Sequence, residues 1–391
     1  MRYLIIVFIF SNTIIGHNLD SLKTIYGLQK SIYNLSKCEE ILYQIRILQD
    51  DDWVFNEEIS IAELKGNHGK AVELISDNTL YAQSIVGKVR LTNNLIKMKD
   101  YESASIIFST IDSSDYNFTL YEKAGDAYLG RAIIDTALEY YRSSIKTGNS
   151  SSAIFLKLSR LYVQTENYEI AKDILYKAVN LHPYDTKLLK LYTEVLFTLK
   201  DYLNTVNIGL RVIDKGDTTY SITQKLGLAY YFIAEENVSR GTDIKYRESL
   251  KYLRLSSQLD EKDPLNYFYI GMNYSSMEVY DSAASYFNKS IDSFYPSYVA
   301  DVYIQLGSVF QKDNQYAKAI KNYRKAFEFA AHRRNILFYL ANVYDHYYYD
   351  KKPAKNTYQK FLNNNNSSDQ KLLDYANLRI EELVEQIHFR D

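Results

Sequence analysis

The stretch of sequence that decides the fold is Ala300–Arg333, which reads ADVYIQLGSVFQKDNQYAKAIKNYRKAFEFAAHR. Its apolar and small residues recur at separations of three and four, first at Tyr303, Leu306, Gly307 and Phe310 and then at Ala319, Tyr323 and Ala326. This spacing places each set on one face of a helix, so we predict two helices. Gly307 and Ala319 are small enough to let the two helices approach closely, while the aromatic rings fill the flanks.

A small residue recurs at the position of Ala319 along nearly the whole chain. The intervals are 33 to 36 residues, apart from one longer gap before Ser249. The series comprises Cys38, Ala71, Ala104, Ala137, Ala171, Thr205, Ser249, Ala283, Ala319 and Ala354. A fixed period of this length is typical of a repeat array, in which each repeat packs only on its neighbours. We therefore predict an all-α architecture of about ten stacked repeats.

The motif inside each repeat resembles the tetratricopeptide repeat, whose helix pair carries an aromatic residue, Leu-Gly and an aromatic residue, followed by Ala, an aromatic residue and Ala. One repeat supplies Tyr121, Ala124, Gly125, Tyr128, Ala137, Tyr141 and Ser144, and another supplies Tyr267, Ile270, Gly271, Tyr274, Ala283, Phe287 and Ser290. The resemblance implies a right-handed helix-turn-helix solenoid over residues 19–366 and a function in binding proteins or peptides.

The two ends of the chain carry their own signals. Residues 1–18 are predicted to be a signal peptide, because Arg2 is followed by an uncharged segment that is too short to span a membrane. An uncleaved interfacial or membrane anchor is the alternative. Residues 367–391 predict a capping helix that covers the last repeat, with Arg379 and the nearby acidic residues facing water. Its apolar stripe comprises Leu372, Ala376, Ile380, Leu383 and Ile387.

One interruption of the repeat pattern is larger than the others. About ten surplus residues fall at 234–245, in a polar segment that contains Gly241. We predict an extended helix end followed by an exposed loop, which is either a neutral insertion or a functional one.

Composition and motifs argue against several classes of function. The net charge is −2, with 46 basic and 48 acidic side chains interleaved along the chain, which does not favour nucleic-acid binding. The six histidines are scattered and Cys38 is the single cysteine, so we predict no metal site. The sequence contains no phosphate-binding glycine loop and no nucleophile elbow. We therefore predict no cofactor and no enzymatic activity.

Apolar residues on the first helices of the later repeats suggest a binding surface. The resemblance implies that these positions line the concave face of the solenoid; they are Phe197, Leu228, Tyr231, Phe232, Leu265, Phe268, Met272, Ile304 and Phe338. An exposed apolar patch would indicate a partner, whereas tighter packing between repeats would fill the surface from within. Comparable positions in earlier repeats are polar: Thr119, Glu122, Asp126, Arg160 and Gln164.

Some members of the family bind C-terminal carboxylates with a clamp of Lys and Asn on successive first helices, and this clamp is not evident here. Lys190 is followed four residues later by Glu194, which would repel the ligand. Asn93 is preceded on its face by Val89 instead of a lysine.

These features predict an exported scaffold that binds a protein or peptide partner in a bacterial cell envelope. The compartment would be the periplasm, the outer membrane or the exterior, with no membrane span after removal of the signal. A homo-oligomer is compatible with the sequence. The alternative is a small-molecule or glycan-binding envelope protein, in which tyrosines and Phe268 stack on sugar rings.

Overall fold

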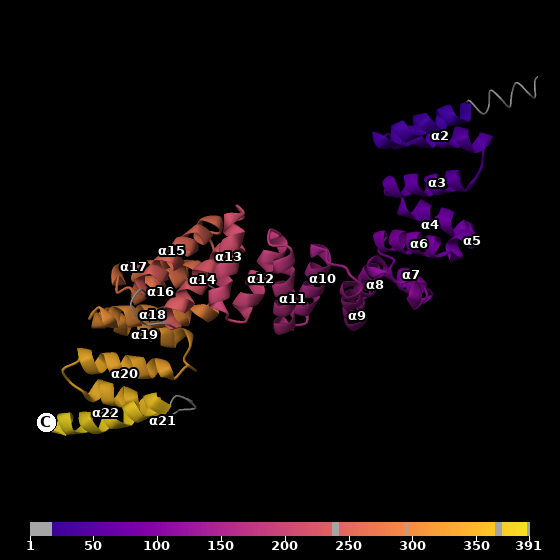
Figure 1. Cartoon of the computed structure of the whole chain (residues 1–391). Helices are drawn as coiled ribbons and strands as arrows, with labels where there is room; N and C mark the ends of the chain where they lie inside the picture. The colour runs from indigo at the N-terminus through magenta and orange to yellow at the C-terminus, as the bar shows by residue number, and fades with distance from the viewer. Residues whose placement is uncertain (1–17, 237–241, 294–295, 364–369, 389–391) are drawn as a thin grey trace, which may run out of the picture. The chain divides into compact units, whose positions relative to one another are not determined.

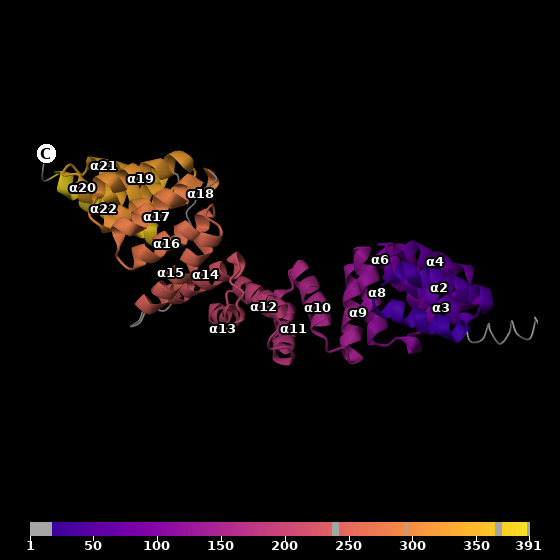
Figure 2. The same ribbon diagram turned by 90° about the horizontal axis from the view of Figure 1, so that it is seen from above.

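The computed structural model describes residues 18–236, 242–293, 296–363 and 370–388, and these residues form helices and connections without any strand (Figure 1). The all-α prediction is therefore confirmed. The chain divides between Glu166 and Asn167 into two compact parts, which we call unit 1 and unit 2. Within each unit, consecutive helices pack side by side (Figures 1 and 2).

Unit 1 begins with helical residues 18–31 and contains ten further elements. They are α2 (Leu35–Leu48), α3 (Asp52–Leu64), α4 (His68–Asp77), α5 (Thr79–Gln83), α6 (Ile85–Lys97), α7 (Tyr101–Ser109), η1 (Ser113–Asp115), α8 (Phe118–Gly130), α9 (Ile134–Lys146) and α10 (Ser152–Gln164). The short α5 and η1 are additions to the pairwise helical pattern.

Unit 2 continues the pattern with longer helices in its middle. Its elements are α11 (Tyr168–Leu181), α12 (Thr186–Thr198), α13 (Tyr202–Asp214), α14 (Tyr220–Glu236), α15 (Thr242–Leu259), α16 (Pro264–Ser276), α17 (Tyr280–Ser293), α18 (Pro296–Lys312), α19 (Tyr316–Phe329), α20 (Asn335–Tyr347), α21 (Lys352–Asn363) and α22 (Gln370–His388). At the predicted insertion, α14 and α15 have 17 and 18 residues, so extended helices take up part of the surplus. The predicted loop tip at 237–241 lies outside the described residues.

The periodic small residues form the contact between the two helices of each repeat. All ten members of the series, from Cys38 to Ala354, have an exposed fraction of 0%. A larger side chain at these positions would push packed helices apart, because protein interiors have no spare volume. The series therefore predicted the stacking correctly, including the polar members Thr205 and Ser249.

A glycine on the first helix of several repeats faces an aromatic ring on the second helix, 16 residues later. A Cβ atom built on Gly125 would lie 2.5 Å from the ring of Tyr141, and one on Gly307 would lie 2.6 Å from the ring of Tyr323. Real Cβ contacts are not this short. Glycine is therefore required here for close approach and not for backbone conformation.

The turn between the paired helices also repeats. The backbone is left-handed at Tyr33, Gly66, Lys99, Ala132, Glu166, Lys200, Glu278 and Asn314, with φ between +56° and +72°. Each of these residues lies five positions before the small residue of its repeat. This conformation lets the chain bond back to the helix it leaves: the N–H of Asp100 donates to the carbonyl of Leu95. The Asp100 carboxylate then accepts from the N–H of Ser103 and caps the next helix.

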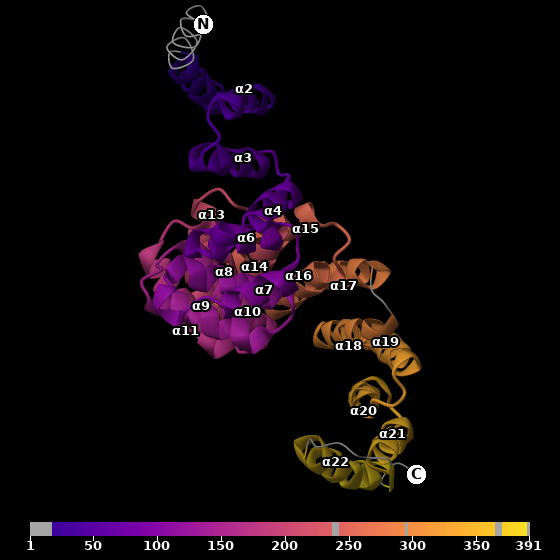
Figure 3. The same cartoon turned by 90° about the vertical axis from the view of Figure 1, so that its right-hand side faces the viewer.

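The C-terminal helix α22 packs on α21 (Figure 3). Ala376 and Leu383 of the predicted stripe are buried, and the other three members are half-buried. One detail of the prediction was wrong, because Arg379 does not simply face water. Its Nε donates to Asp345 Oδ2 at 2.6 Å and its Nη2 to Oδ1 at 3.2 Å. The Asp345 side chain is 5% exposed, so α22 is fastened to α20 by a largely buried ion pair.

The lengths and hydropathies of the helices bear on the membrane question. Within the described part of the chain, no helix combines the length and the apolar character that crossing a membrane requires. The predicted signal peptide lies outside the described residues, apart from Asn18 at the start of the first helix.

Candidate functional site

Aromatic side chains of unit 2 connect five of the nine predicted surface residues. Tyr202 packs against Phe197 with ring centroids 5.8 Å apart and stacks on Phe232 at 4.8 Å. Tyr269 contacts Phe232, Tyr231 and Phe268 at 5.7, 5.4 and 5.3 Å. Met272 packs against the same clusters. Tyr202 and Tyr269 were not among the predicted residues, although Tyr202 belongs to the tyrosines that recur between helices.

The exposure of the predicted surface residues differs widely. Tyr231 is 4% and Phe338 is 9% exposed, so these two side chains belong to the core and offer little surface to a partner. Phe197, Leu228, Phe232, Phe268, Met272 and Ile304 are half-buried, and Leu265 is 42% exposed. Much of this surface is covered by contacts between repeats, because the rings pack edge to face and stacked on each other.

Ile304 lines an open pocket on α18, α19 and α20, which we call the α18–α20 pocket. Its volume is about 480 Å³. Its walls are Ile304, Gln305, Ser308, Gln311, Lys312, Tyr316, Tyr323, Tyr339 and His346. The pocket thus combines aromatic rings, amides, a hydroxyl and one cation.

Contacts between helices hold the walls of the α18–α20 pocket in place. The hydroxyl of Tyr323 donates to Gln311 Oε1 at 3.1 Å, and Gln311 Nε2 donates to Asn342 Oδ1 at 2.7 Å. Burial, with a smaller contribution from Tyr339, raises the pKa of Tyr323, so its hydroxyl stays protonated as a donor. The rings of Tyr316 and His346 stack at 6.0 Å.

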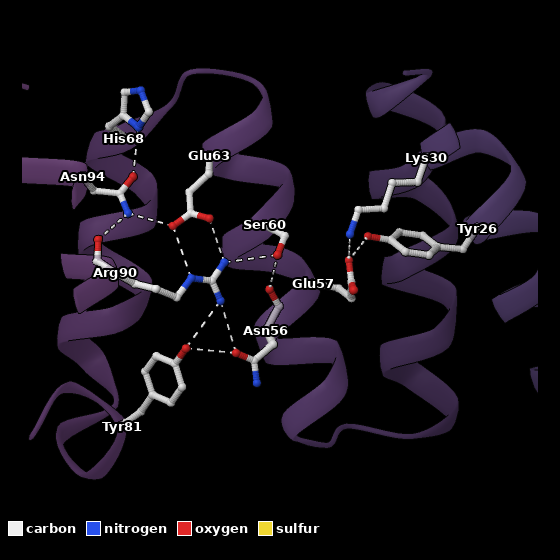
Figure 4. Close-up of polar contacts among 10 residues, drawn as sticks. All are labelled: Tyr26, Lys30, Asn56, Glu57, Ser60, Glu63, His68, Tyr81, Arg90 and Asn94. Carbon is white, nitrogen blue, oxygen red and sulfur yellow. Dashed lines mark hydrogen bonds and ion pairs between the residues drawn. The ribbon is translucent and has the colours of Figure 1, made fainter. Parts of the chain in front are cut away.

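A polar network in unit 1 joins α3 to α6 through Arg90 (Figure 4). The Arg90 guanidinium donates to both oxygens of Glu63, from Nη2 at 2.8 Å and from Nε at 3.3 Å. It also donates to Ser60 Oγ at 3.1 Å, Asn56 Oδ1 at 3.2 Å and the Tyr81 hydroxyl at 3.4 Å. These contacts occupy most of the guanidinium donors. Arg90 therefore fixes neighbouring repeats and has little capacity left for a ligand.

The same network orients Asn94 and His68 (Figure 4). Asn94 Nδ2 donates to Glu63 Oε1 and to the carbonyl of Arg90, each at 2.8 Å. Because both partners can only accept, the Asn94 oxygen must face His68 Nδ1, 2.9 Å away. The His68 Nδ1 is then the donor in this contact.

Two further carboxylates of unit 1 are held by one lysine. Lys157 Nζ on α10 donates at 2.8 Å to Glu122 Oε1 and to both oxygens of Asp126. The Tyr141 hydroxyl adds a hydrogen bond of 2.7 Å to Asp126 Oδ1. At the start of the unit, Tyr26 and Lys30 both donate to Glu57 (Figure 4).

A pocket of about 610 Å³ is lined by residues of both the Arg90 network and the Lys157 network, and we call it the unit 1 pocket. It is lined by Glu63, His68, Arg90, Asn93, Asn94, Ile96, Lys97, Lys99, Tyr101, Lys123 and Asp126. Sequence reasoning missed this pocket. A signal was nevertheless present, because Arg90, Lys123 and Lys157 stand at intervals of 33 and 34 on successive first helices.

The described residues contain no group of three or more His, Cys, Asp or Glu side chains placed to hold a metal ion. Paired helices that stack through small side chains, with open polar and aromatic pockets on their surfaces, define a helical-repeat binding protein.

Comparison with known proteins identifies the repeat. The family model of the tetratricopeptide repeat matches residues 152–185 and 300–332, so these two segments are similar to that repeat. A TPR repeat-containing protein of Methanocaldococcus jannaschii is 25% identical over 232 residues, which are 58% of this chain and 35% of that protein. The chain therefore spans about a third of that relative's length.

Two solved structures illustrate the similarity. One is in the APC/C hetero-tetramer Cut9–Hcn1, with 11% identity, a TM-score of 0.43, and coverage of 93% of this chain and 97% of that chain. The other is YrrB, described as a TPR protein with an unusual peptide-binding site. It has 17% identity, a TM-score of 0.44, and coverage of 51% of this chain and 97% of that chain.

Proposed function

We propose that this chain is a non-catalytic scaffold that binds an extended or helical segment of a protein partner at the α18–α20 pocket. The observation that carries the proposal is the composition of that pocket, in which Ile304, Tyr316 and Tyr339 offer apolar surface next to Gln305 and Lys312. Aromatic anchors in a pocket with a few polar groups are the usual source of affinity in peptide recognition.

The polar groups of the pocket suit a peptide backbone. Among the described residues, Gln305 and Lys312 have no side-chain hydrogen bond or ion pair, so they are available to main-chain amides or to an acidic side chain. Gln311 is engaged with Asn342 and Tyr323 and acts as a fixed wall. One or two side chains of a partner would fill about 480 Å³.

The proposal includes export to a bacterial envelope, where the partner would reside. It is supported by the uncharged segment from Tyr3 to Ile15, which follows Arg2. Mass spectrometry of the chain purified from an expressing bacterium gives the mature N-terminus directly. Cleavage near residue 18 agrees with export, and an intact Met1 in the cytoplasm contradicts it.

A selection experiment tests the binding function. Peptides displayed on phage are selected on the full chain, and a labelled winner is titrated by fluorescence anisotropy. Ile304→Gln should weaken binding at least tenfold, because it places an amide in the apolar part of the pocket. Leu203→Gln is the matched control, since Leu203 is exposed on α13 and outside the pocket. Equal affinities of the Ile304→Gln variant and the wild type for the peptide would show that the binding site is not the α18–α20 pocket.

The second candidate function is glycan binding at the same pocket. The stacked rings of Tyr316 and His346, with an interplanar angle of 22°, present the kind of flat surface on which sugar rings pack. A glycan array probed with the full chain separates the two. Saturable glycan binding that Tyr316→Ala abolishes, together with failure to select any peptide, would favour this alternative.

A further inference from the structure

We propose that a pocket formed by α2, α3 and α4 binds a tyrosine side chain of the protein partner, in a space that later repeats fill with a side chain of their own. We call it the α2–α4 pocket, and its volume is about 540 Å³. The inference rests on the proposed scaffold function but concerns a different pocket, which lies in unit 1. Both α2 and α4 are second helices of their repeats, so this pocket is not on the first-helix surface considered above.

The pocket lies where the second repeat departs from the pattern of the others. Nine residues before the small residue, this repeat carries Ala62, which lines the pocket. Six later repeats carry a large side chain at that position, and each is buried or half-buried: Leu95, Tyr128, Tyr162, Leu196, Tyr274 and Phe310. Ala62 therefore leaves vacant a space that a larger side chain occupies elsewhere in the chain.

The rest of the second repeat does not fill this space. Ile59 takes the position that glycine has at Gly125 and Gly307, and Ile75 takes the position of the facing ring of Tyr141. Ile59 and Ile75 are fully buried in one core cluster with Ala62. The second repeat thus places its bulk at the contact between α3 and α4, and the space beside Ala62 stays open.

The chain's own tyrosines show which group suits a space of this kind. In three later repeats, a guanidinium on a second helix lies over the ring of a tyrosine on the next first helix and donates to its hydroxyl. The pairs are Arg142–Tyr162, Arg254–Tyr274 and Arg324–Tyr344, with 5.3, 5.8 and 5.7 Å from the guanidinium carbon to the ring centroid. A ring with a para hydroxyl is therefore the group that packs between such helices beside an arginine.

The floor of the α2–α4 pocket is apolar. Leu42, Ile61 and Ala62 are 2%, 2% and 6% exposed and line it from two helices. Tyr43 stands at its edge with 67% of its surface exposed, so its ring can pack against an entering ring. The volume exceeds what one ring requires, which leaves room for the peptide backbone beside a bound tyrosine.

The charged groups around the floor favour a neutral ring that carries a hydroxyl. Arg46 binds Glu58 through Nη1 at 2.8 Å and Asp50 through Nε at 3.4 Å, and Lys65 binds Glu39 at 2.6 Å. These paired charges have little attraction left for a free carboxylate or ammonium group. In the described part of the chain, Nη2 of Arg46 has no further contact, so it can donate to a tyrosine hydroxyl as the later arginines do.

The test follows the isoleucine methyl groups of the full chain by nuclear magnetic resonance. The probe is an acetylated peptide with one tyrosine among glycines and serines. We expect a saturable shift of the Ile61 methyl signals, because an aromatic ring shifts the resonances of atoms packed against it, and no shift of Ile304, which lines the other pocket. The same peptide with phenylalanine should bind at least threefold more weakly, because it lacks the hydroxyl, and the peptide with alanine should cause no shift.

Variants that fill the pocket provide the second arm. Ala62→Tyr and Ala62→Leu restore the residue types of Tyr162 and Leu95, so both should abolish the Ile61 response and raise the midpoint of thermal unfolding. Ser36→Tyr is the matched control, because Ser36 is exposed on α2 outside the pocket, and it should keep the response. A lower midpoint in both Ala62 variants would overturn the inference, because it would show that the space beside Ala62 is not a vacant side-chain position.

Other results would also overturn the inference. An undiminished Ile61 response in Ala62→Leu would place the ring outside the pocket, and equal responses to the tyrosine and alanine peptides would show that no ring is recognised. A response to p-cresol without any response to the tyrosine peptide would identify a site for free phenols instead of a protein partner.

The result is separable from the test of the α18–α20 pocket. Ile304→Gln should leave the Ile61 response to the tyrosine peptide unchanged, because Ile304 belongs to unit 2 and lines a different pocket. If the phage-selected peptides bind equally to Ile304→Gln and wild type while the tyrosine peptide shifts Ile61, the α18–α20 proposal fails and the α2–α4 site stands. The opposite result removes the α2–α4 site alone.

Discussion

Adding one methyl group at Gly125 tests the packing rule on which the whole stack depends. The Cβ of Gly125→Ala would lie 2.5 and 2.6 Å from two ring carbons of Tyr141, whose side chain is fully buried. The ring cannot simply turn away, because its hydroxyl is bound to Asp126 on the same helix as Gly125. The helices or the ring must therefore shift.

The expected free-energy change combines two opposing effects. Overpacking a well-packed interior costs about 1–3 kcal/mol. Replacing glycine by alanine inside a helix contributes about 0.5–1 kcal/mol in the other direction. Gly125→Ala should therefore lower the free energy of unfolding by about 1 kcal/mol, and by at most about 2.5 kcal/mol. Gly27→Ala is the matched control in the same unit, because nothing lies within 4 Å of its added Cβ, and it should be neutral or stabilising.

Urea denaturation followed by circular dichroism at the helical minimum measures both variants. The double variant Gly125→Ala/Tyr141→Leu removes the ring that the methyl group meets, so the two substitutions should be coupled by about 1 kcal/mol or more. Equal stabilities of Gly125→Ala and Gly27→Ala would refute the reasoning. Additive effects of Gly125→Ala and Tyr141→Leu would do so as well, because they would show that the two side chains do not compete for one space.

Four other substitutions follow from the same structure. Ala137→Leu, at a position with no exposed surface, should destabilise unit 1 by about 1–3 kcal/mol in the same urea assay, and an unchanged midpoint would count against the repeat register. Arg379→Met should increase hydrogen exchange across α20 to α22, because it leaves the buried Asp345 carboxylate with only Lys351, 3.4 Å away. Burial alone would raise the pKa of Asp345, but Arg379 outweighs it and the net shift is downward. The stabilisation by this ion pair is therefore full above about pH 4 and is lost as pH falls through the folded-state pKa, so the difference between wild type and Asp345→Asn should shrink in acid. Arg90→Met should loosen α3 from α6 and leave the Glu63 carboxylate without its cation, with only the Asn94 hydrogen bond remaining. Limited proteolysis of unit 1 would detect this as faster cleavage than in wild type.

The regular parts of this fold could be predicted from sequence because each repeat is specified by its own local pattern. The small residue, the glycine and the aromatic ring that faces the glycine occur at constant separations. A segment of about 20 residues therefore specifies the contact between the paired helices. Ser249 fitted the series despite the longer gap before it, and it is as buried as Ala283. Features that are set by residues within one repeat can therefore be predicted from the periodicity of the sequence.

The roles of the polar and aromatic surface residues depend on contacts with the neighbouring repeat, and the periodicity of the sequence does not predict these contacts. Arg379 looked solvent-exposed because its own helix offers no reason for burial, yet Asp345, 34 residues earlier, pairs with it. Tyr231 looked like a surface residue until Tyr269, from the next first helix, packed against it. In both cases the deciding contact joins residues of different repeats.

The position of Lys123, 14 residues before the small residue of its repeat, shows how local pattern and contacts between repeats act together. The same position holds Glu57, Arg90, Lys123 and Lys157 in four repeats of unit 1, whereas three repeats of unit 2 have the uncharged Leu191, Tyr269 and Gln305 there. One structural position therefore serves ion pairing in some repeats and apolar or amide contacts in others. The uncharged Gln305 therefore leaves the α18–α20 pocket open to an apolar anchor of a partner, whereas Glu57, Arg90 and Lys157 are held in ion pairs at the equivalent positions of unit 1.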